Sequence, residues 1–228
     1  MKHSNMVVAQ TVSSIVYERI REFVLTGRFL PGQWLREKEL IEILGVSRTP
    51  IREAFRRLEQ EQLVESVPRY GFRVRTFSKE EIRDFFELRA ELEGMAAGLA
   101  AERATVNSVR EISESLTQAR LSLDEGDSAD VIRANNLFHD RVAESSGNQA
   151  LVRCLKQLRA GVNLQRVLTW SKHKDRPSAT LGQHFEIYRA IKDGDSRLAR
   201  TTASKHVLDS LELALETIVF SEHSTNPD

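Results

Sequence analysis

Residues 45–58 read GVSRTPIREAFRRL, and this stretch carries the signals of a short helix with one apolar side. Ser47 stands where its hydroxyl can cap the helix by accepting backbone N–H bonds, and Pro50 is tolerated because it lies in the first turn. The apolar residues recur at helical spacing and form an inward stripe: Ile51, Phe55 and Leu58. We therefore expect a helix that packs on a core through one side only.

The other side of this helix is basic. Three arginines recur every four residues and stack along it: Arg48, Arg52 and Arg56. A guanidinium binds a phosphate or both acceptors of a guanine edge, which is what a helix in the major groove of DNA requires. Ser47 and Thr49 add hydroxyls at the helix N-terminus, whose free N–H groups favour a phosphate. The plain alternative is a solvated surface helix with paired charges, but the surrounding pattern favours DNA binding.

The segments on both sides of this helix complete a recognisable arrangement. Residues 11–26 and 36–44 have the apolar spacing of two helices, and a glycine follows each of them closely. Residues 63–67 and 72–77 have the extended pattern of two strands around a turn that contains Pro and Gly. Three short helices followed by a basic hairpin predict a winged helix-turn-helix.

Residues 11–76 resemble the GntR family of bacterial transcription regulators. The motifs in the family's places are Pro31-Gly32, Leu35, Glu39-Leu40, residues 45–50, residues 51–54, Arg57-Leu58, Leu63-Val64 and Gly71. The resemblance implies that six residues contact DNA: Lys38, Ser47, Arg48, Thr49, Arg52 and Gly71. Gly71 would let the wing tip approach the minor groove because it has no side chain. Gln62 stands where the family usually has Gly, and we expect this departure to affect only how the helix ends.

Beyond Ser78 the chain has helical periodicity and no strand pattern. Ser78 and Glu81 form a capping box for a helix that reaches about Arg103. Its expected inward stripe is Phe85, Leu88, Leu92, Ala96 and Leu99. Further helices are expected over residues 106–125, 130–145, 149–170, 179–192 and 195–219, with a loop over residues 172–178.

The predicted fold class is mainly α. A winged helix-turn-helix DNA-binding domain over residues 1–77 precedes an all-α antiparallel helical bundle over residues 78–228, which we expect to bind an effector and to dimerise.

Four polar residues interrupt apolar stripes of this bundle: Asn135, His139, His184 and His206. Three imidazoles and an amide oxygen from three helices can bind one divalent transition metal ion. The alternative for any single histidine is a hydrogen-bonded core residue.

The same region resembles the C-terminal ligand-sensing FCD domain of the FadR-type branch of the family. Matching motifs are residues 135–139, Glu144, residues 146–148, Gln183-His184, Ala190-Ile191, Gly194-Asp195 and Lys205-His206. The resemblance implies a metal site at Asn135, His139, His184 and His206, for which we expect zinc, with nickel or manganese as alternatives. Asn135 replaces the more usual acidic ligand, so the site has one negative charge fewer and favours an anionic effector that completes the coordination.

These parts together predict a homodimeric regulator, expected to be a repressor, that binds a palindromic operator in double-stranded DNA and a small carboxylate effector. Arg89 is our candidate partner for the effector carboxylate, with an i,i+4 pair to Glu93 as the alternative role. Three other functions stay open: the same fold without metal sensing a larger ligand such as an acyl thioester, a DNA-binding protein without effector, and a metal-dependent enzyme fused to a DNA-binding head. The absence of an H-E-x-x-H motif speaks against the enzyme.

The composition agrees with two parts of different charge. The 228 residues carry 33 basic and 33 acidic side chains, but residues 1–77 hold 13 basic against 9 acidic ones, and residues 78–228 hold 20 against 24. A polyanion therefore prefers the first part. The apolar runs are too short to cross a membrane, the single Cys154 excludes an intrachain disulfide, and no leader sequence is evident, so we expect a cytoplasmic protein.

Overall fold

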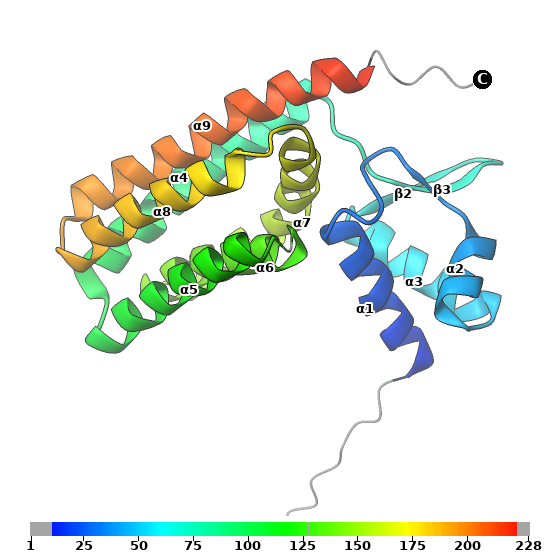
Figure 1. The fold of residues 1–228 in the computed structure, drawn as a ribbon, viewed down its shortest axis with the longest axis horizontal. Coiled ribbons are helices and arrows are strands. Elements are labelled where there is room, and N and C mark those ends of the chain that lie inside the picture. The colour runs from blue at the N-terminus through cyan, green and yellow to red at the C-terminus, as the bar shows by residue number, and fades with distance from the viewer. Residues whose placement is uncertain (1–10, 127, 223–228) are drawn as a thin grey trace, which may run out of the picture. The chain divides into compact units, whose positions relative to one another are not determined.

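The computed structural model describes residues 11–126 and 128–222. It divides the chain into two compact units, one up to Thr76 and one from Phe77 onward. The first unit contains α1 to α3 and a small sheet, and the second is built from α4 to α9 (Figure 1).

The N-terminal unit is a winged helix-turn-helix. Its elements are α1 (Val12–Leu25), β1 (Trp34–Leu35), α2 (Glu37–Leu44), α3 (Arg48–Gln60), β2 (Val64–Val67) and β3 (Gly71–Val74). The strands form an antiparallel sheet in the order β1-β3-β2, in which Val64 pairs with Val74 and Leu35 with Phe72. Strand β1 is not evident from the sequence, because two residues are too few to show a strand's alternation.

The core of this unit lies under α3. The predicted stripe of Ile51, Phe55 and Leu58 is fully buried, and the Phe55 ring packs on Phe72 of the wing with centroids 4.8 Å apart. This packing leaves the arginine side of α3 exposed. One detail was wrong: Ser47 occupies the cap position, but its side chain makes no capping bond. Burial of Pro50 and Ile51 holds the helix start in its place, so the Ser47 hydroxyl stays on the surface.

The C-terminal unit consists, over the described residues, of helices, most of which lie lengthwise beside one another, while the one labelled α7 runs across them (Figure 1). They are α4 (Lys79–Arg103), α5 (Val106–Glu125), α6 (Ser128–Ser145), α7 (Gln149–Lys172), α8 (Arg176–Lys192) and α9 (Ser196–Glu222). The capping box is present as predicted: Glu81 N donates to Ser78 Oγ at 3.1 Å, and Ser78 N donates to Glu81 Oε2 at 2.9 Å.

Two predictions for this unit were wrong in detail. The loop expected over residues 172–178 is much shorter, because Pro177 lies in the first turn of α8, where its missing N–H costs nothing. The expected stripe on α4 is also rotated, since Leu88 is 51% exposed while Ile82, Phe86 and Ala90 are buried. The reason is that α4 packs along α9 through its small residues, and a Cβ on Gly94 would overlap the Ser204 hydroxyl of α9.

Within the described residues, no helix is both long and apolar enough to cross a membrane.

Candidate functional site

Three histidines from three helices meet inside the C-terminal unit. His139 comes from α6, His184 from α8 and His206 from α9, and one ring nitrogen of each lies within 4.8 Å of the others. His184 Nε2 and His206 Nε2 are 3.3 Å apart. The three histidines are separated by 22 to 67 positions in the chain, yet their ring nitrogens come together in one place. A single metal ion requires this arrangement.

Hydrogen bonds orient two of these rings. His139 Nδ1 lies 2.6 Å from Glu93 Oε2, and His206 Nδ1 lies 2.9 Å from Gln183 Oε1. The Gln183 amide is itself oriented, since its Nε2 donates to Asp209 Oδ2 at 2.9 Å. Both acceptors are oxygens without a proton, so each Nδ1 carries the hydrogen and each Nε2 keeps its lone pair. Such outer bonds are typical of metal-ligating histidines.

The third ring is held by stacking. His184 is 1% exposed, and its ring lies on Phe138 with centroids 4.1 Å apart and planes at 17°. Burial lowers the pKa of His184 and of His206 well below the usual value, and the neighbouring histidines add to the effect. Burial also lowers the pKa of His139, although Glu93 opposes the shift. All three imidazoles are therefore neutral near pH 7, the state in which histidine binds a metal.

Glu93 is the acidic group of this cluster. Burial alone would raise its pKa, but the charge of Arg89 and the hydrogen bond from His139 outweigh burial and hold the pKa of Glu93 well below its usual range. Arg89 Nε donates to Glu93 Oε1 at 2.6 Å, so the alternative role expected for Arg89 is present in the structure. Arg89 Nη2 also lies 3.5 Å from His139 Nε2, which places this guanidinium beside the histidines.

Asn135 lies one helical turn before His139 and is buried. The orientation of its amide that satisfies hydrogen bonding turns the oxygen to Arg166, which donates from two nitrogens at 3.1 and 3.2 Å. Arg166 therefore competes with any metal ion for this oxygen. The three histidines fit a metal ion by their geometry, and Asn135 would join them only by giving up its bonds to Arg166.

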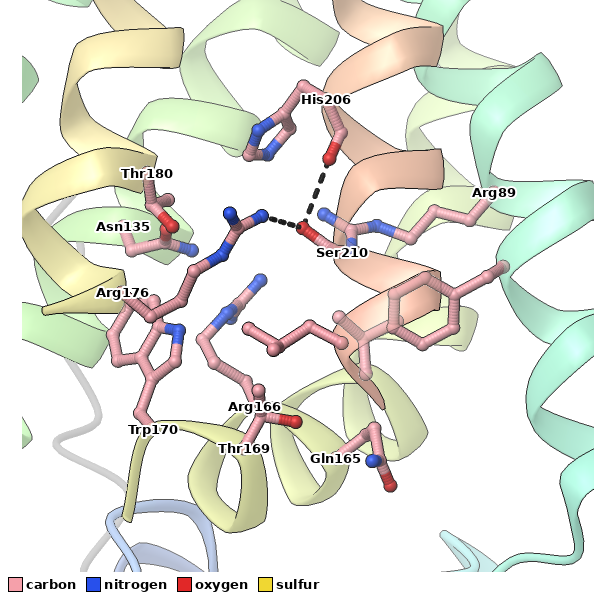
Figure 2. A pocket seen from close by; sticks show the side chains of 13 residues that line it. Arg89, Asn135, Gln165, Arg166, Thr169, Trp170, Arg176, Thr180, His206 and Ser210 are labelled. Atoms are coloured by element: carbon pink, nitrogen blue, oxygen red, sulfur yellow. Dashed lines mark hydrogen bonds between the residues drawn. The ribbon is translucent and has the colours of Figure 1, made fainter. Parts of the chain in front are cut away.

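A cavity opens next to the histidines. It has a volume of about 390 Å³ including its solvent-open mouth, and Figure 2 shows the guanidinium groups of three arginines pointing into it together with His206: Arg89, Arg166 and Arg176. A second cavity on the other side of Arg89 and Arg166 is bounded by α6 and α7 and reaches Glu93 and His139. The histidine cluster is thus accessible to a small ligand.

Four residues of this site are not evident from the sequence: Glu93 as a partner of histidine, Gln183, Arg166 and Arg176. Arg166 carried a usable signal, because it is a charged residue that shares a helical face with Val162 and Thr169 on α7. No sequence pattern indicates the partners of the histidine rings, since Glu93 and His139, for example, are 46 positions apart.

The six residues expected to contact DNA lie on the surface of the N-terminal unit. Lys38, Ser47, Arg48, Thr49, Arg52 and Gly71 are all exposed. Arg52 Nε donates to the carboxylate of Glu37 on α2 at 2.8 Å, and Arg48 Nε forms an ion pair with the same carboxylate at 3.1 Å. Gly71 follows the exposed Tyr70 at the wing turn and has a φ of 103°, which a residue with a side chain rarely adopts.

Family models match both units. Residues 13–74 match the model described as "Bacterial regulatory proteins, gntR family", and residues 84–209 match that of the FCD domain. The chain is 30% identical, over 90% of its length and 89% of the relative's, to a probable D-xylose utilization operon transcriptional repressor of Paenarthrobacter nicotinovorans. It is 26% identical, over 89% of both chains, to the HTH-type transcriptional repressor RspR of Escherichia coli.

The fold also matches solved structures. The structure of E. coli McbR/YncC aligns with a TM-score of 0.75 at 24% identity and covers 91% of this chain and 99% of that one.

Proposed function

The chain belongs to the GntR family of bacterial transcription regulators and carries an FCD domain, and on this premise we propose that it controls transcription through a small organic acid bound at a metal ion. Family membership makes it a DNA-binding regulator and sets the enzyme alternative aside. The finer parts of the proposal are the metal, the acid, the direction of control and the dimer.

The proposed DNA contacts are Lys38, Ser47, Arg48, Thr49, Arg52 and Gly71. Their exposure and the two arginines on one face of α3 support this assignment. We propose that the chain acts as a homodimer on a palindromic operator, because two-fold symmetry presents two identical heads to two half-sites. The names of two relatives favour repression.

The observation that carries the metal site is the orientation of the histidine rings. Glu93 and Gln183 accept the Nδ1–H of His139 and His206, so the Nε2 atoms of both rings keep a lone pair. A metal ion would bind these lone pairs in place of their present contacts with Arg89 Nη2 and His184 Nε2. A divalent ion bound there would supply positive charge and open coordination positions for a carboxylate. Zinc is our first choice because three imidazoles suit it, with nickel or manganese as alternatives, and Asn135 is the proposed fourth ligand.

Control requires the acid to favour one arrangement of the DNA-binding units. A coupling free energy of about 1 to 3 kcal/mol changes DNA affinity roughly 5- to 150-fold. Arg89 is the proposed partner of the effector carboxylate, since it lines both cavities beside the histidines.

The test is the metal content of tag-free protein, measured by elemental mass spectrometry. We expect near-stoichiometric metal in the parent chain, loss in His139→Ala and in His184→Ala, and retention in His173→Ala, a matched change in the loop before α8. A parent chain that takes up no zinc, nickel or manganese would contradict the metal site. DNA binding is tested separately, with duplexes selected from a random pool.

A further inference from the structure

The cavity beside His206 has an unusual balance of charge. Three guanidinium groups line it, those of Arg89, Arg166 and Arg176, while no carboxylate is among the described residues of its wall. In Figure 2 these groups converge toward the space below His206. Glu93 lies outside this wall and is already shared between Arg89 and His139.

Arg166 shows the imbalance most clearly. Its guanidinium donates to the amide oxygens of Asn136 and Asn163, both at 2.7 Å, and these partners are neutral. The Trp170 ring, whose centroid lies 5.6 Å from the guanidinium carbon, is neutral as well. A partly buried cation with only neutral partners is destabilised by its own charge, and a bound anion would relieve that cost.

Arg176 is in a similar position. Its Nη2 donates to Ser210 Oγ at 3.1 Å, and Ser210 in turn donates to the backbone oxygen of His206. No described carboxylate forms an ion pair with Arg176. This guanidinium is therefore held in the cavity by a hydroxyl, with donors left for a ligand.

An independent sign of a polar ligand comes from Thr169. Thr169 is buried, and its hydroxyl lines the same cavity. Among the buried side-chain oxygen and nitrogen atoms of the described residues, this hydroxyl is the one that has no hydrogen-bond partner. A buried hydroxyl without a partner costs free energy, which an oxygen-rich ligand would recover.

We propose that this cavity binds a small acid with at least two carboxylates, one placed near the histidines and Arg89 and the other held by Arg166 and Arg176. The three guanidinium groups carry three positive charges and Glu93 supplies one negative charge, so a single carboxylate would leave one positive charge uncompensated. A wall with three guanidinium groups suits a compact, multiply charged acid better than an acyl thioester, whose apolar chain carries no charge. This inference deepens the proposed function, but the arginines do not need a metal ion to distinguish acids by charge.

The experiment is calorimetric titration of the full chain at constant ionic strength with propionate, succinate, propane-1,2,3-tricarboxylate and inorganic phosphate. We expect succinate to bind at least about tenfold more tightly than propionate, and the tricarboxylate at least as tightly as succinate. Equal affinities for propionate and succinate would overturn the proposal. Tighter binding of phosphate than of succinate would overturn the choice of carboxylates.

Arginine variants locate the second carboxylate. Arg176→Gln should weaken succinate about tenfold and propionate less than about threefold, and Arg166→Gln should do the same. Arg153→Gln, an exposed change on the same helix as Arg166, is the matched control and should change neither. Arg166→Gln could unfold because its bonds to the asparagines are lost, and in that case Arg176→Gln alone tests the proposal. An unchanged preference for succinate in Arg176→Gln would refute the role of Arg166 and Arg176.

The two proposals fail in different ways. Repeating the titrations after chelator treatment, with metal content measured, tests the arginines alone. An untreated chain that takes up no zinc, nickel or manganese and still prefers succinate would support the present inference and contradict the metal site. Stoichiometric metal without a preference for succinate would support the metal site and contradict the present inference.

Discussion

Arg52 Nε of α3 donates to Glu37 Oε1 of α2 at 2.8 Å, and this ion pair joins the two helices of the helix-turn-helix on their exposed side. The other oxygen of Glu37 forms an ion pair with Arg48 Nε at 3.1 Å. One carboxylate thus holds two of the proposed DNA-contacting arginines before DNA is present. Exposed ion pairs add little stability, so the effect of Glu37 should appear in DNA binding and not in folding.

Glu37→Gln should therefore raise affinity for random duplex DNA by roughly three- to tenfold at low salt and reduce discrimination in favour of selected sequences. The reason is that one negative charge leaves the interface while the arginines lose their common anchor. Fluorescence anisotropy with both DNAs over a range of salt concentrations measures this. Glu42→Gln, an exposed change on the same helix, is the control. An unchanged ratio of the two affinities would rule out this positioning role.

Arg52→Ala should weaken binding to selected DNA by about 1 to 3 kcal/mol, because it removes a base or phosphate contact and no core side chain. The oligomeric state, followed by analytical ultracentrifugation, should stay the same. Arg110→Ala, which alters an exposed arginine of the C-terminal unit, should leave DNA binding intact. Parent-like affinity in Arg52→Ala would remove this residue from the interface.

Gln62→Gly should stabilise the N-terminal unit by about 1 kcal/mol. Gln62 has a φ of 58°, a left-handed conformation that is costly for any residue with a Cβ and free of strain for glycine. The departure from the family's glycine therefore affects stability as well as the helix end. Gln60→Gly, made in the last turn of α3, should instead destabilise by up to about 1 kcal/mol. Scanning calorimetry compares them, and shifts of the same sign in both would refute the explanation.

Metal-free protein should lose stability as the pH falls below about 6.5. The pKa values of His139, His184 and His206 in the folded chain lie below the ordinary value. On acidification the unfolded chain therefore binds protons at a higher pH than the folded chain does. This stability is present above the unfolded pKa and is lost on acidification toward the folded pKa values. Between pH 7.5 and 5.5 the three groups together should cost roughly 2 to 4 kcal/mol.

Urea unfolding at the two pH values measures this loss. His184→Gln cannot titrate at this position and should reduce the loss by about a third. His173→Ala removes a histidine of the short loop before α8 and should not change it. A parent chain whose unfolding free energy is the same at both pH values would contradict the buried neutral state of the cluster.

Local signals in the chain were enough to predict the winged helix, the helical C-terminal unit and the family. The stripe of Ile51, Phe55 and Leu58, the capping box of Ser78 and Glu81, and the glycine at the wing turn act over a few residues, so they can be read without knowing what packs where. The inward position of the histidines was predictable for the same reason.

The partners of these residues became known only from the folded chain. Glu93 meets His139, Gln183 meets His206, and Arg166 meets Asn136 across helices, at separations of 23 to 46 positions. Such contacts depend on the rotation and spacing of whole helices, as the close approach of Gly94 on α4 to α9 shows. Periodicity specifies which side of a helix is buried, but helix packing decides which side chains of neighbouring helices come into contact. The charge of the cavity results from those contacts.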